Sequence, residues 1–361
     1  MTGYYTAVIF ITVFSMLAMV IAAYSNSFLE RERKRGFIAV FCCIALVAGA
    51  EWLGIRLDGA AAGLRGVHIA AKCVEFSLSP AIPVICAGAV RSCRSTRWMA
   101  IPLGVHAALE LLSARFGFIF FVDAGNVYHR RGEYWIYIAA VLLGIVFLFY
   151  RSYQLSNQYQ NRKGSVLALI LIFLVSSTGI QIIDRTIRIS WISAAMAAML
   201  FYIYFSELIQ QMDATTTLLN RRSYDRSIES LARPAMVLFF DVDNFKEVND
   251  RYGHQFGDVC LLRVGQQIRA AYGKYGLCYR FGGDEFCVIL QRQLGFVEKL
   301  NASFLRRMEH QRETEPRLPW VSMGYSRFDP AQEKVETAMR RADAMMYRYK
   351  QRKKEIPPAD R

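Results

Sequence analysis

The sequence predicts two parts: an all-α bundle of about seven transmembrane helices, followed by an α+β domain with a ferredoxin-like antiparallel sheet. Three observations lead to this fold class. The chain of 361 residues is 54% hydrophobic, which is high for a soluble protein. Its apolar residues concentrate in the first ~210 positions, as expected when a membrane region precedes a soluble domain. Beyond them, strand-like and helix-like segments alternate as they do in globular domains.

Apolar segments of about 20 residues can cross a bilayer as helices. The segments that reach or approach this length are Tyr4–Tyr24, Phe37–Leu57, Val67–Val90, Trp98–Phe121, Tyr134–Tyr150, Val166–Ile183 and Ile189–Phe205. Polar residues interrupt the third and fourth segments, so the number of spans is about seven. The first segment has neither a preceding basic residue nor a small-residue cleavage site, and we expect an anchor rather than a removed signal peptide.

Basic residues between the spans predict the orientation of the chain. With an odd number of spans, the first, third and fifth loops lie on the same side as the C-terminal domain. These loops hold Arg31, Arg33, Lys34, Arg35, Arg91, Arg94, Arg97, Arg151, Arg162 and Lys163. The opposite loops hold Arg56, Arg65, Arg130, Arg131, Arg185 and Arg188. The excess on the first side predicts a cytoplasmic C-terminal domain.

The net charge of +14 raises the question of a nucleic-acid partner. Many of the basic residues lie between apolar segments, where they attract anionic lipid, and no interleaved basic and aromatic motif is present. We therefore expect a lipid bilayer and no nucleic acid as a partner.

Several ionisable residues lie inside the predicted spans, where charge is costly unless it is paired or hydrated. They are Glu51, His68, Lys72, Glu75, His106 and Glu110. The spacings i,i+3 for Lys72 and Glu75, and i,i+4 for His106 and Glu110, place each pair on one helix face. Two interpretations stay open: a cavity for an unknown sensed ligand, or structural ion pairs between helices.

The segment Ser206–Met212 has helix-forming composition and can extend the last span as a linker helix, which could pair with a second copy as a short coiled coil. The soluble elements then follow in the order β-α-α-β-β-α-β-α after one leading helix, which predicts a ferredoxin-like sheet with helices on one face. The expected domains are a membrane bundle over 1–205, a linker over 206–219, a catalytic domain over 220–354 and a tail over 355–361.

The stretch "YRFGGDEFCVIL", Tyr279–Leu290, places Gly-Gly-Asp-Glu at the tip of a predicted hairpin. Asp241 lies at the end of an earlier buried strand, and carboxylates at these two positions can converge. Two such groups with a backbone carbonyl make an all-oxygen site suited to Mg²⁺ and triphosphate. Lys246 and the N-terminus of its helix add donors for phosphate.

Five segments, in this order, resemble the GGDEF domain of bacterial diguanylate cyclases: "DVDNFKEVND", "YGHQFGDVCL", "RFGGDEF", "VSMGYS" and "ADAMMYRYK". The resemblance covers about 213–354, and it implies the nucleotide-cyclase type of ferredoxin-like fold. The N-terminal half is similar only in architecture to the multi-helix sensor regions that precede such domains. The implied location is a bacterial inner membrane, crossed several times.

The resemblance implies a two-metal centre. Asp241, Asp284 and the carbonyl of Val242 would hold two Mg²⁺ ions, with Mn²⁺ as an alternative. Glu285 would assist the metals or accept the proton of the 3′-hydroxyl. Catalysis would also need Gly282 and Gly283, where a side chain would collide with the α-phosphate.

The same resemblance assigns the substrate, GTP. Asn249 and Asp258 would bind guanine, because an aspartate can accept from both N1–H and the exocyclic amine, whereas adenine presents an acceptor at N1. The other implied substrate contacts are Phe245, Lys246, Arg280, Lys350 and Lys354. Each domain would bind one GTP, so a homodimer formed through the linker helix and the GGDEF domains would be needed to make cyclic di-GMP and pyrophosphate.

The chain departs from the family pattern at three places. The opening motif Asp-x-Leu-Thr-Gly-Leu-x-Asn-Arg-Arg reads "DATTTLLNRR" here, with Thr215 for Leu and Thr217 for Gly. Near the end, "KQRKKE" replaces Lys-x-x-Gly-Arg-Asn, so that Lys354 stands where Arg is usual. The inhibitory Arg-x-x-Asp is replaced by Gly273-Lys274-Tyr275-Gly276, which predicts no product inhibition at that site.

Two other functions make different predictions about these residues. A catalytically silent receptor for GTP or a cyclic dinucleotide predicts a damaged hairpin or metal ligand, whereas Asp241 and Gly282 to Glu285 are all present. A cyclase that makes a mixed guanine–adenine dinucleotide is disfavoured by Asp258 at the base-binding position.

Overall fold

The computed structural model describes residues 2–90, 96, 98–158, 164–183, 187–291 and 294–355. It divides into two compact units, Met1–Ile209 and Gln210–Arg361, and each is described by itself.

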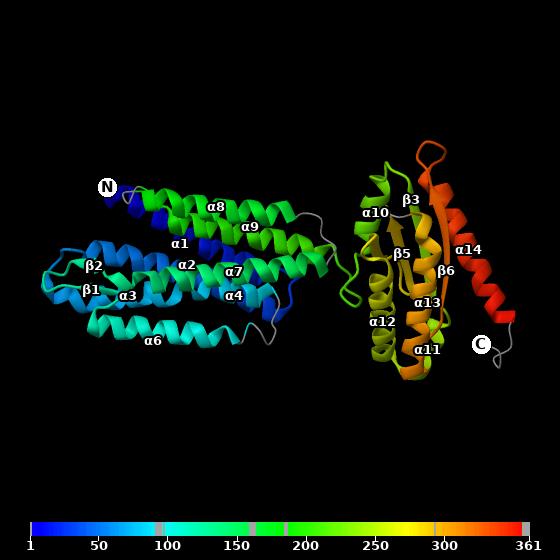
Figure 1. Ribbon diagram of the computed structural model, residues 1–361, viewed down its shortest axis with the longest axis horizontal. Coiled ribbons are helices and arrows are strands. Elements are labelled where there is room, and N and C mark those ends of the chain that lie inside the picture. The colour runs from blue at the N-terminus through cyan, green and yellow to red at the C-terminus, as the bar shows by residue number, and fades with distance from the viewer. Residues whose placement is uncertain are drawn as a thin grey trace. The chain divides into compact units, whose positions relative to one another are not determined.

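The first unit is helical (Figure 1). Its α-helices are α1 (Thr2–Ser25), α2 (Arg31–Leu57), α3 (Arg65–Leu78), α4 (Ala81–Val90), α6 (Ala100–Phe116), α7 (Trp135–Gln158), α8 (Gly164–Ile183) and α9 (Ser190–Gln210). Short 3₁₀ helices at Ala62–Leu64 and Gly132–Tyr134 precede α3 and α7. Many large apolar side chains on these helices are exposed, which is expected of a surface that faces lipid.

Five segments of the described chain are helical, long and apolar enough to cross a membrane: Gly3–Ser25, Arg31–Leu57, Ala62–Val90, Gly132–Gln154 and Ser190–Gln210. The predicted number of seven is therefore not confirmed. The third segment is broken between α3 and α4, where Pro80 cannot continue the hydrogen-bonding of a helix. The predicted fourth span, Trp98–Phe121, was wrong at its end, because α6 stops at Phe116 and Gly117 adopts a left-handed φ of 71°.

A two-stranded hairpin of β1 (Phe120–Val122) and β2 (Tyr128–Arg130) follows α6. Its turn is anchored by Asn126, which is fully buried. The Asn126 amide donates to the carbonyl of Leu57 at 2.8 Å, and its Oδ1 lies 3.0 Å from Nδ1 of His68. This hairpin was not predicted from the sequence, because its apolar first strand extends the pattern of the preceding helix.

The ionisable pairs predicted inside the spans face the interior of the first unit. Lys72 Nζ lies 2.8 Å from Glu75 Oε2, and both side chains are buried. His106 Nε2 lies 3.1 Å from the carbonyl of Phe76 and 3.5 Å from Glu110 Oε1. Each pair shares a helix face, as its spacing predicts.

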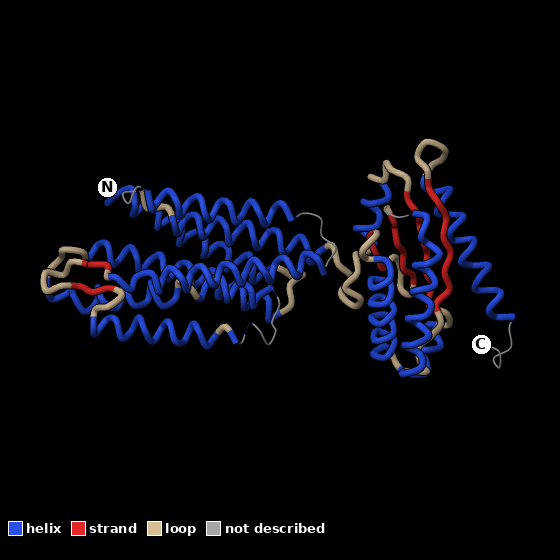
Figure 2. Tube along the Cα trace, in the orientation of Figure 1, coloured by secondary structure: helices blue, strands red, loops and turns tan. Residues whose placement is uncertain are grey.

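The second unit contains a four-stranded sheet in the order β4-β5-β3-β6, with antiparallel neighbours throughout. Figure 2 shows its strands in red among the helices of this unit. Its strands are β3 (Ala235–Val242), β4 (Gly276–Arg280), β5 (Glu285–Leu290) and β6 (Val321–Phe328). Its α-helices are α10 (Arg221–Glu229), α11 (Phe245–Tyr252), α12 (His254–Tyr272), α13 (Val297–Thr314) and α14 (Val335–Glu355), with a 3₁₀ turn at Leu294–Phe296.

Helices cover both faces of this sheet, so the expectation of helices on one face was wrong. Alternate residues of β3 enter two separate cores, since successive side chains of a strand point to opposite faces. Leu238 and Phe240 pack with residues of α12 and α13, whereas Val237 and Phe239 pack with residues of α10 and α14. The close approach of α14 depends on Gly324, where a Cβ would lie 2.2 Å from the Ala342 carbonyl.

Helix α9, which leads from the first unit into the second, ends earlier than the predicted linker helix. α9 stops at Gln210, and Asn220 donates from its side chain to the carbonyls of Gln210 and Met212. These bonds satisfy carbonyls that the helix end leaves without a partner. Residues 213–217 then form a turn, flanked by a bridge between Met212 and Leu219.

Candidate active site

The acidic residues predicted for the site meet at one end of the sheet. Asp241 lies one residue before the end of β3, and it is directly paired with Glu285, the first residue of β5. Directly opposed residues in antiparallel strands have Cα atoms about 5 Å apart and side chains on the same face. The Val242 N–H donates to the carbonyl of Asp284 at 3.1 Å. The pairing therefore brings Asp241, Asp284 and Glu285 to one edge.

The turn between β4 and β5 is closed by the Glu285 carbonyl, which accepts from the N–H groups of Phe281 and Gly282 at 2.8 and 3.2 Å. A Cβ at Gly282 would lie 2.4 Å from Glu285 Oε2, so glycine there gives the Glu285 side chain its place. A Cβ at Gly283 would meet no atom within 4 Å. The space above Gly283 is therefore open to a bound molecule.

A cavity of about 490 Å³ lies beside these acids, between the strand ends and α14. It is lined by Asp241, Glu285, Asp343, Met346, Tyr347, Lys350 and Gln351. Asp343 was not predicted. The available signal was its position two helical turns before Lys350, a spacing that places both residues on one face of α14.

The charges of the site are unbalanced toward the acids. Burial raises the pKa of Asp241 against the hydrogen bond and charge of Lys350, and the charges of Asp284 and Asp243 raise it further. Burial also raises the pKa of Glu285, with the charges of Asp284, Asp241 and Asp343 adding to the effect and Arg221 opposing it. Clustered carboxylates that disfavour one another's ionisation are stabilised by a bound cation.

A cationic group already contacts one of these acids. Lys350 Nζ donates to Asp241 Oδ1, and the bond and charge of Asp241 raise the pKa of Lys350 although burial opposes them. The possible metal ligands around Lys350 are carboxylate and carbonyl oxygens, which suit Mg²⁺ or Mn²⁺. Within the described part of the chain, no three Asp, Glu, His or Cys residues yet form a complete metal cage. The residues fit a divalent ion whose remaining ligands come from phosphate.

The residues predicted to bind the base lie on α11 and α12, and α12 packs on the face of the sheet opposite to α14. Gly257 is the contact between them, because a Cβ there would lie 1.9 Å from Asn249 Oδ1 and 3.2 Å from the Phe245 ring. Asp258 follows Gly257 and is exposed. The amide of Asn249 and the carboxylate of Asp258 are thus presented by adjacent helices, and Gly257 is a residue that the sequence analysis missed.

Comparisons with known proteins agree with this geometry. Residues 210–355 match the family described as "Diguanylate cyclase, GGDEF domain". This part of the chain is a GGDEF domain. A similar protein, the diguanylate cyclase DgcP of Escherichia coli, is 29% identical over 212 residues, which are 56% of this chain and 59% of DgcP. The diguanylate cyclase DgcS of Shewanella oneidensis is 40% identical over 86 residues, 22% of this chain and 29% of DgcS.

The chain therefore spans less than two thirds of the length of these curated relatives. Among solved structures, the GGDEF domain of DgcB from Caulobacter crescentus in complex with c-di-GMP matches 39% of this chain and 90% of its own, with 25% identity and a TM-score of 0.34.

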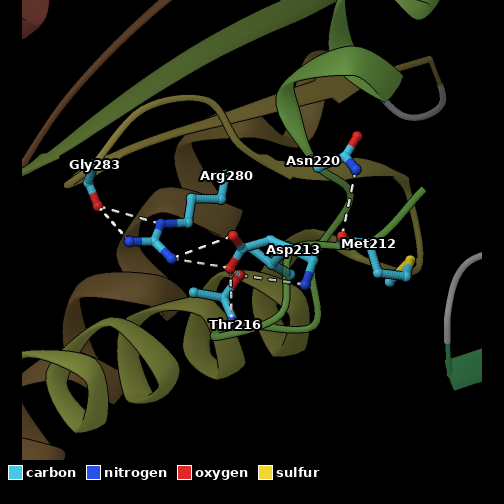
Figure 3. Close-up of polar contacts among 7 residues, drawn as sticks. Met212, Asp213, Thr216, Asn220, Arg280 and Gly283 are labelled. Atoms are coloured by element: carbon cyan, nitrogen blue, oxygen red, sulfur yellow. Dashed lines mark hydrogen bonds and ion pairs between the residues drawn. The ribbon is translucent and has the colours of Figure 1, made fainter. Parts of the chain in front are cut away.

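Two of the basic residues assigned to the substrate are placed differently from Lys350. Lys246 is exposed on α11, on the side of the base-binding residues. Arg280 is not among the residues that line the cavity, and its guanidinium contacts Asp213 and the carbonyl of Gly283 (Figure 3). Lys354 lies in the last turn of α14, outside the described side chains, and residues 356–361 of the tail lie outside the described chain.

The segment that replaces the inhibitory motif follows α12. Gly273 caps the helix, and the N–H of Tyr275 donates to the Tyr272 carbonyl at 2.9 Å. Lys274 lies over the Tyr275 ring at 5.9 Å from its centroid. This turn of the GGDEF domain presents neither the arginine nor the aspartate of the family motif.

Proposed function

We propose that the chain is a membrane-anchored diguanylate cyclase, which condenses two GTP molecules into cyclic di-GMP across two facing GGDEF domains. The observation that carries this proposal is the pairing of Asp241 with Glu285 beside an open Gly-Gly turn and a cavity that holds Lys350. A silent receptor needs no such set of acids at the strand ends.

The residues on the two sides of the sheet would divide the nucleotide between them. Asn249 and Asp258 would bind the guanine base, with Phe245 beside it. Lys246 and Lys350 would contact the β- and γ-phosphates, as would Lys354. For Lys350 this requires release from Asp241, and the negative charge of an incoming triphosphate can draw it away.

Asp241, Asp284 and the Val242 carbonyl would hold two divalent ions, with Mg²⁺ as the expected metal. When bound, such ions neutralise charge on the phosphates and on the attacking oxygen. Glu285 would accept the 3′-hydroxyl proton, and burial and the neighbouring acids raise the pKa of its carboxyl above the ordinary value.

The proposed reaction has two equivalent steps. In each step the 3′-oxygen of one GTP attacks the α-phosphorus of the other, a P–O bond to pyrophosphate breaks, and the hydroxyl proton passes to Glu285. Two such steps close the ring and release two pyrophosphates. Since the reacting atoms belong to two nucleotides, the proposal requires a homodimer through the GGDEF domains and the preceding segment.

The first unit would anchor the enzyme in a bacterial inner membrane, with the GGDEF domain in the cytoplasm, where GTP is available. The excess of basic residues in one set of loops supports this orientation. The membrane unit would sense an unknown ligand or partner, and this signal would activate or restrain the cyclase.

The test is product identification by mass spectrometry after incubation of the full chain, in lipid nanodiscs, with GTP and Mg²⁺. We expect cyclic di-GMP and pyrophosphate from the wild type and none from Asp284→Ala, whose circular dichroism spectrum should be unchanged. A parallel reaction with GTP and ATP together should give no mixed dinucleotide. Wild-type chain that binds GTP without turnover would contradict the proposal.

A further inference from the structure

One arginine connects two turns of the second unit: the turn that follows α9 and the Gly-Gly turn between β4 and β5. We call residues Asp213–Thr217 the junction turn. Arg280, the last residue of β4, donates from Nη1 to Asp213 Oδ1 and Oδ2 at 3.1 and 3.2 Å. From Nε and Nη2 it donates to the carbonyl of Gly283 at 3.2 and 2.7 Å (Figure 3). A single guanidinium therefore connects Gly283 with Asp213, which lies 67 positions before Arg280 in the sequence.

The carboxylate of Asp213 is itself fixed within the junction turn. Its Oδ1 also accepts from the N–H and the hydroxyl of Thr216, both at 2.8 Å, and Thr216 is 1% exposed. The side chains of Arg280 and Asp213 are only 15% and 22% exposed. Charge-assisted hydrogen bonds that are shielded from water restrain the positions of their side chains more strongly than ion pairs on an exposed surface do.

The hydrogen bonds from Arg280 to the Gly283 carbonyl restrain the position of the Asp284 backbone. A trans peptide is planar, so fixing the Gly283 carbonyl fixes the plane that ends at the Cα of Asp284. The next peptide is fixed as well, because the Asp284 carbonyl accepts from the Val242 N–H at 3.1 Å. Asp284 is thus held on one side by β3 and on the other by Arg280.

We propose that Arg280 is a positioning residue, which holds Asp284 in its catalytic place from the junction turn, and is not a contact for GTP. Its four donor contacts are directed to Asp213 and Gly283, so the guanidinium has little left for a phosphate. The inference rests on the proposed cyclase activity only where turnover is measured, since the backbone restraint exists without nucleotide.

The test compares Arg280→Gln, Asp213→Asn and their double variant in the full chain in nanodiscs. Arg341→Gln is the matched control, because Arg341 likewise bridges a carboxylate, that of Glu333, and a carbonyl, that of Arg327, away from the site. Hydrogen exchange of the 281–285 segment is measured without nucleotide, and kcat and KM for GTP are measured with Mg²⁺. Unchanged exchange in β3 reports that each variant is folded.

We expect both single variants to speed exchange in 281–285 and to lower kcat about tenfold or more, with KM changed by less than about threefold. The double variant should be no worse than Arg280→Gln, because both changes break one bridge. Arg280→Lys, which can reach only one partner, should retain an intermediate kcat. A raised KM in Arg280→Gln, with Asp213→Asn unchanged in kcat and exchange, would overturn the proposal.

If the wild type has no cyclase activity, the proposed function fails while the exchange measurement still decides whether Arg280 restrains the turn. If hydrogen exchange in 281–285 is as slow in both single variants as in the wild type, the proposed restraint is rejected, whatever the activity.

Discussion

Three glycines at the site have different roles at the scale of single atoms. Gly282 makes room for the Glu285 carboxylate, and Gly257 makes room for the Asn249 amide, whereas the space at Gly283 is filled by nothing in the protein. The first two therefore position side chains that are proposed to act in catalysis or in binding the base. Only Gly283 leaves space for a bound nucleotide, so the idea that both glycines of the turn serve the α-phosphate holds best for Gly283.

Gly257→Ala tests the base-binding side of the site. The new Cβ would lie 1.9 Å from Asn249 Oδ1, so the amide must turn away. We expect the affinity for a non-hydrolysable GTP analogue to fall about tenfold, the cost of one lost hydrogen bond to a buried polar group. Alanine favours a helix over glycine, so thermal stability should not fall much. Gly295→Ala, where a Cβ meets nothing within 4 Å, is the control in calorimetry, and unchanged affinity in Gly257→Ala would contradict the assignment of Asn249.

Much of the acidic edge could be predicted from the sequence, because both acids flank strongly strand-like segments. Asp241 and Glu285 are brought together by strand pairing alone. Asp343 shares a helix face with Lys350, a signal that the sequence does contain. The contact of Arg280 with Asp213 could not be predicted, since it depends on how distant elements pack. No local pattern indicates which way a long arginine side chain turns.

At the scale of elements, the junction turn carries backbone strain. Thr217 has a φ of 56°, a left-handed value that is unfavourable for a β-branched residue. The family usually has glycine at this position, and here the turn is stabilised by other bonds. Thr217 N–H donates to the Asp213 carbonyl at 2.9 Å, and the Thr217 carbonyl accepts from Arg269.

Thr217→Gly should therefore stabilise the GGDEF domain. Removing the side chain relieves about 1 kcal/mol of strain, which corresponds to a rise of roughly 2–4 °C in Tm for a domain of this size. Thr215→Gly, at a position without positive φ, should lower Tm because glycine gains freedom when the domain unfolds. Thermal unfolding of both variants is followed by intrinsic fluorescence. A lower Tm for Thr217→Gly would show that contacts of the Thr217 side chain outweigh the strain.

The elements themselves were predicted with uneven success. In the GGDEF domain the α-helices and strands follow the predicted order, β-α-α-β-β-α-β-α after one leading helix. The sheet has helices on both faces because β3 and β5 are apolar on both sides, a feature that a list of elements does not reveal. In the membrane unit, apolar composition alone could not separate a long span from a shorter helix followed by a hairpin.

At the scale of the whole molecule, control by product is expected to be absent at the segment after α12. Gly273-Lys274-Tyr275-Gly276 offers one cation and no carboxylate, whereas the family motif uses an arginine and an aspartate. Titration of the full chain with cyclic di-GMP, after removal of co-purified product, should leave initial rates of pyrophosphate release unchanged. Tight binding that lowers turnover and is lost in Lys274→Ala would contradict this prediction.

In the proposed reaction one GGDEF domain supplies only half of the chemistry, because each domain would hold a single GTP. Wild-type chain is therefore co-expressed with an excess of Asp284→Ala chain, and cyclic di-GMP formation is measured per wild-type chain. With one wild-type chain in ten, random pairing predicts about one tenth of the normal rate per wild-type chain, since few wild-type chains meet an intact partner. A rate per wild-type chain that stays constant as the inactive partner increases would contradict the account.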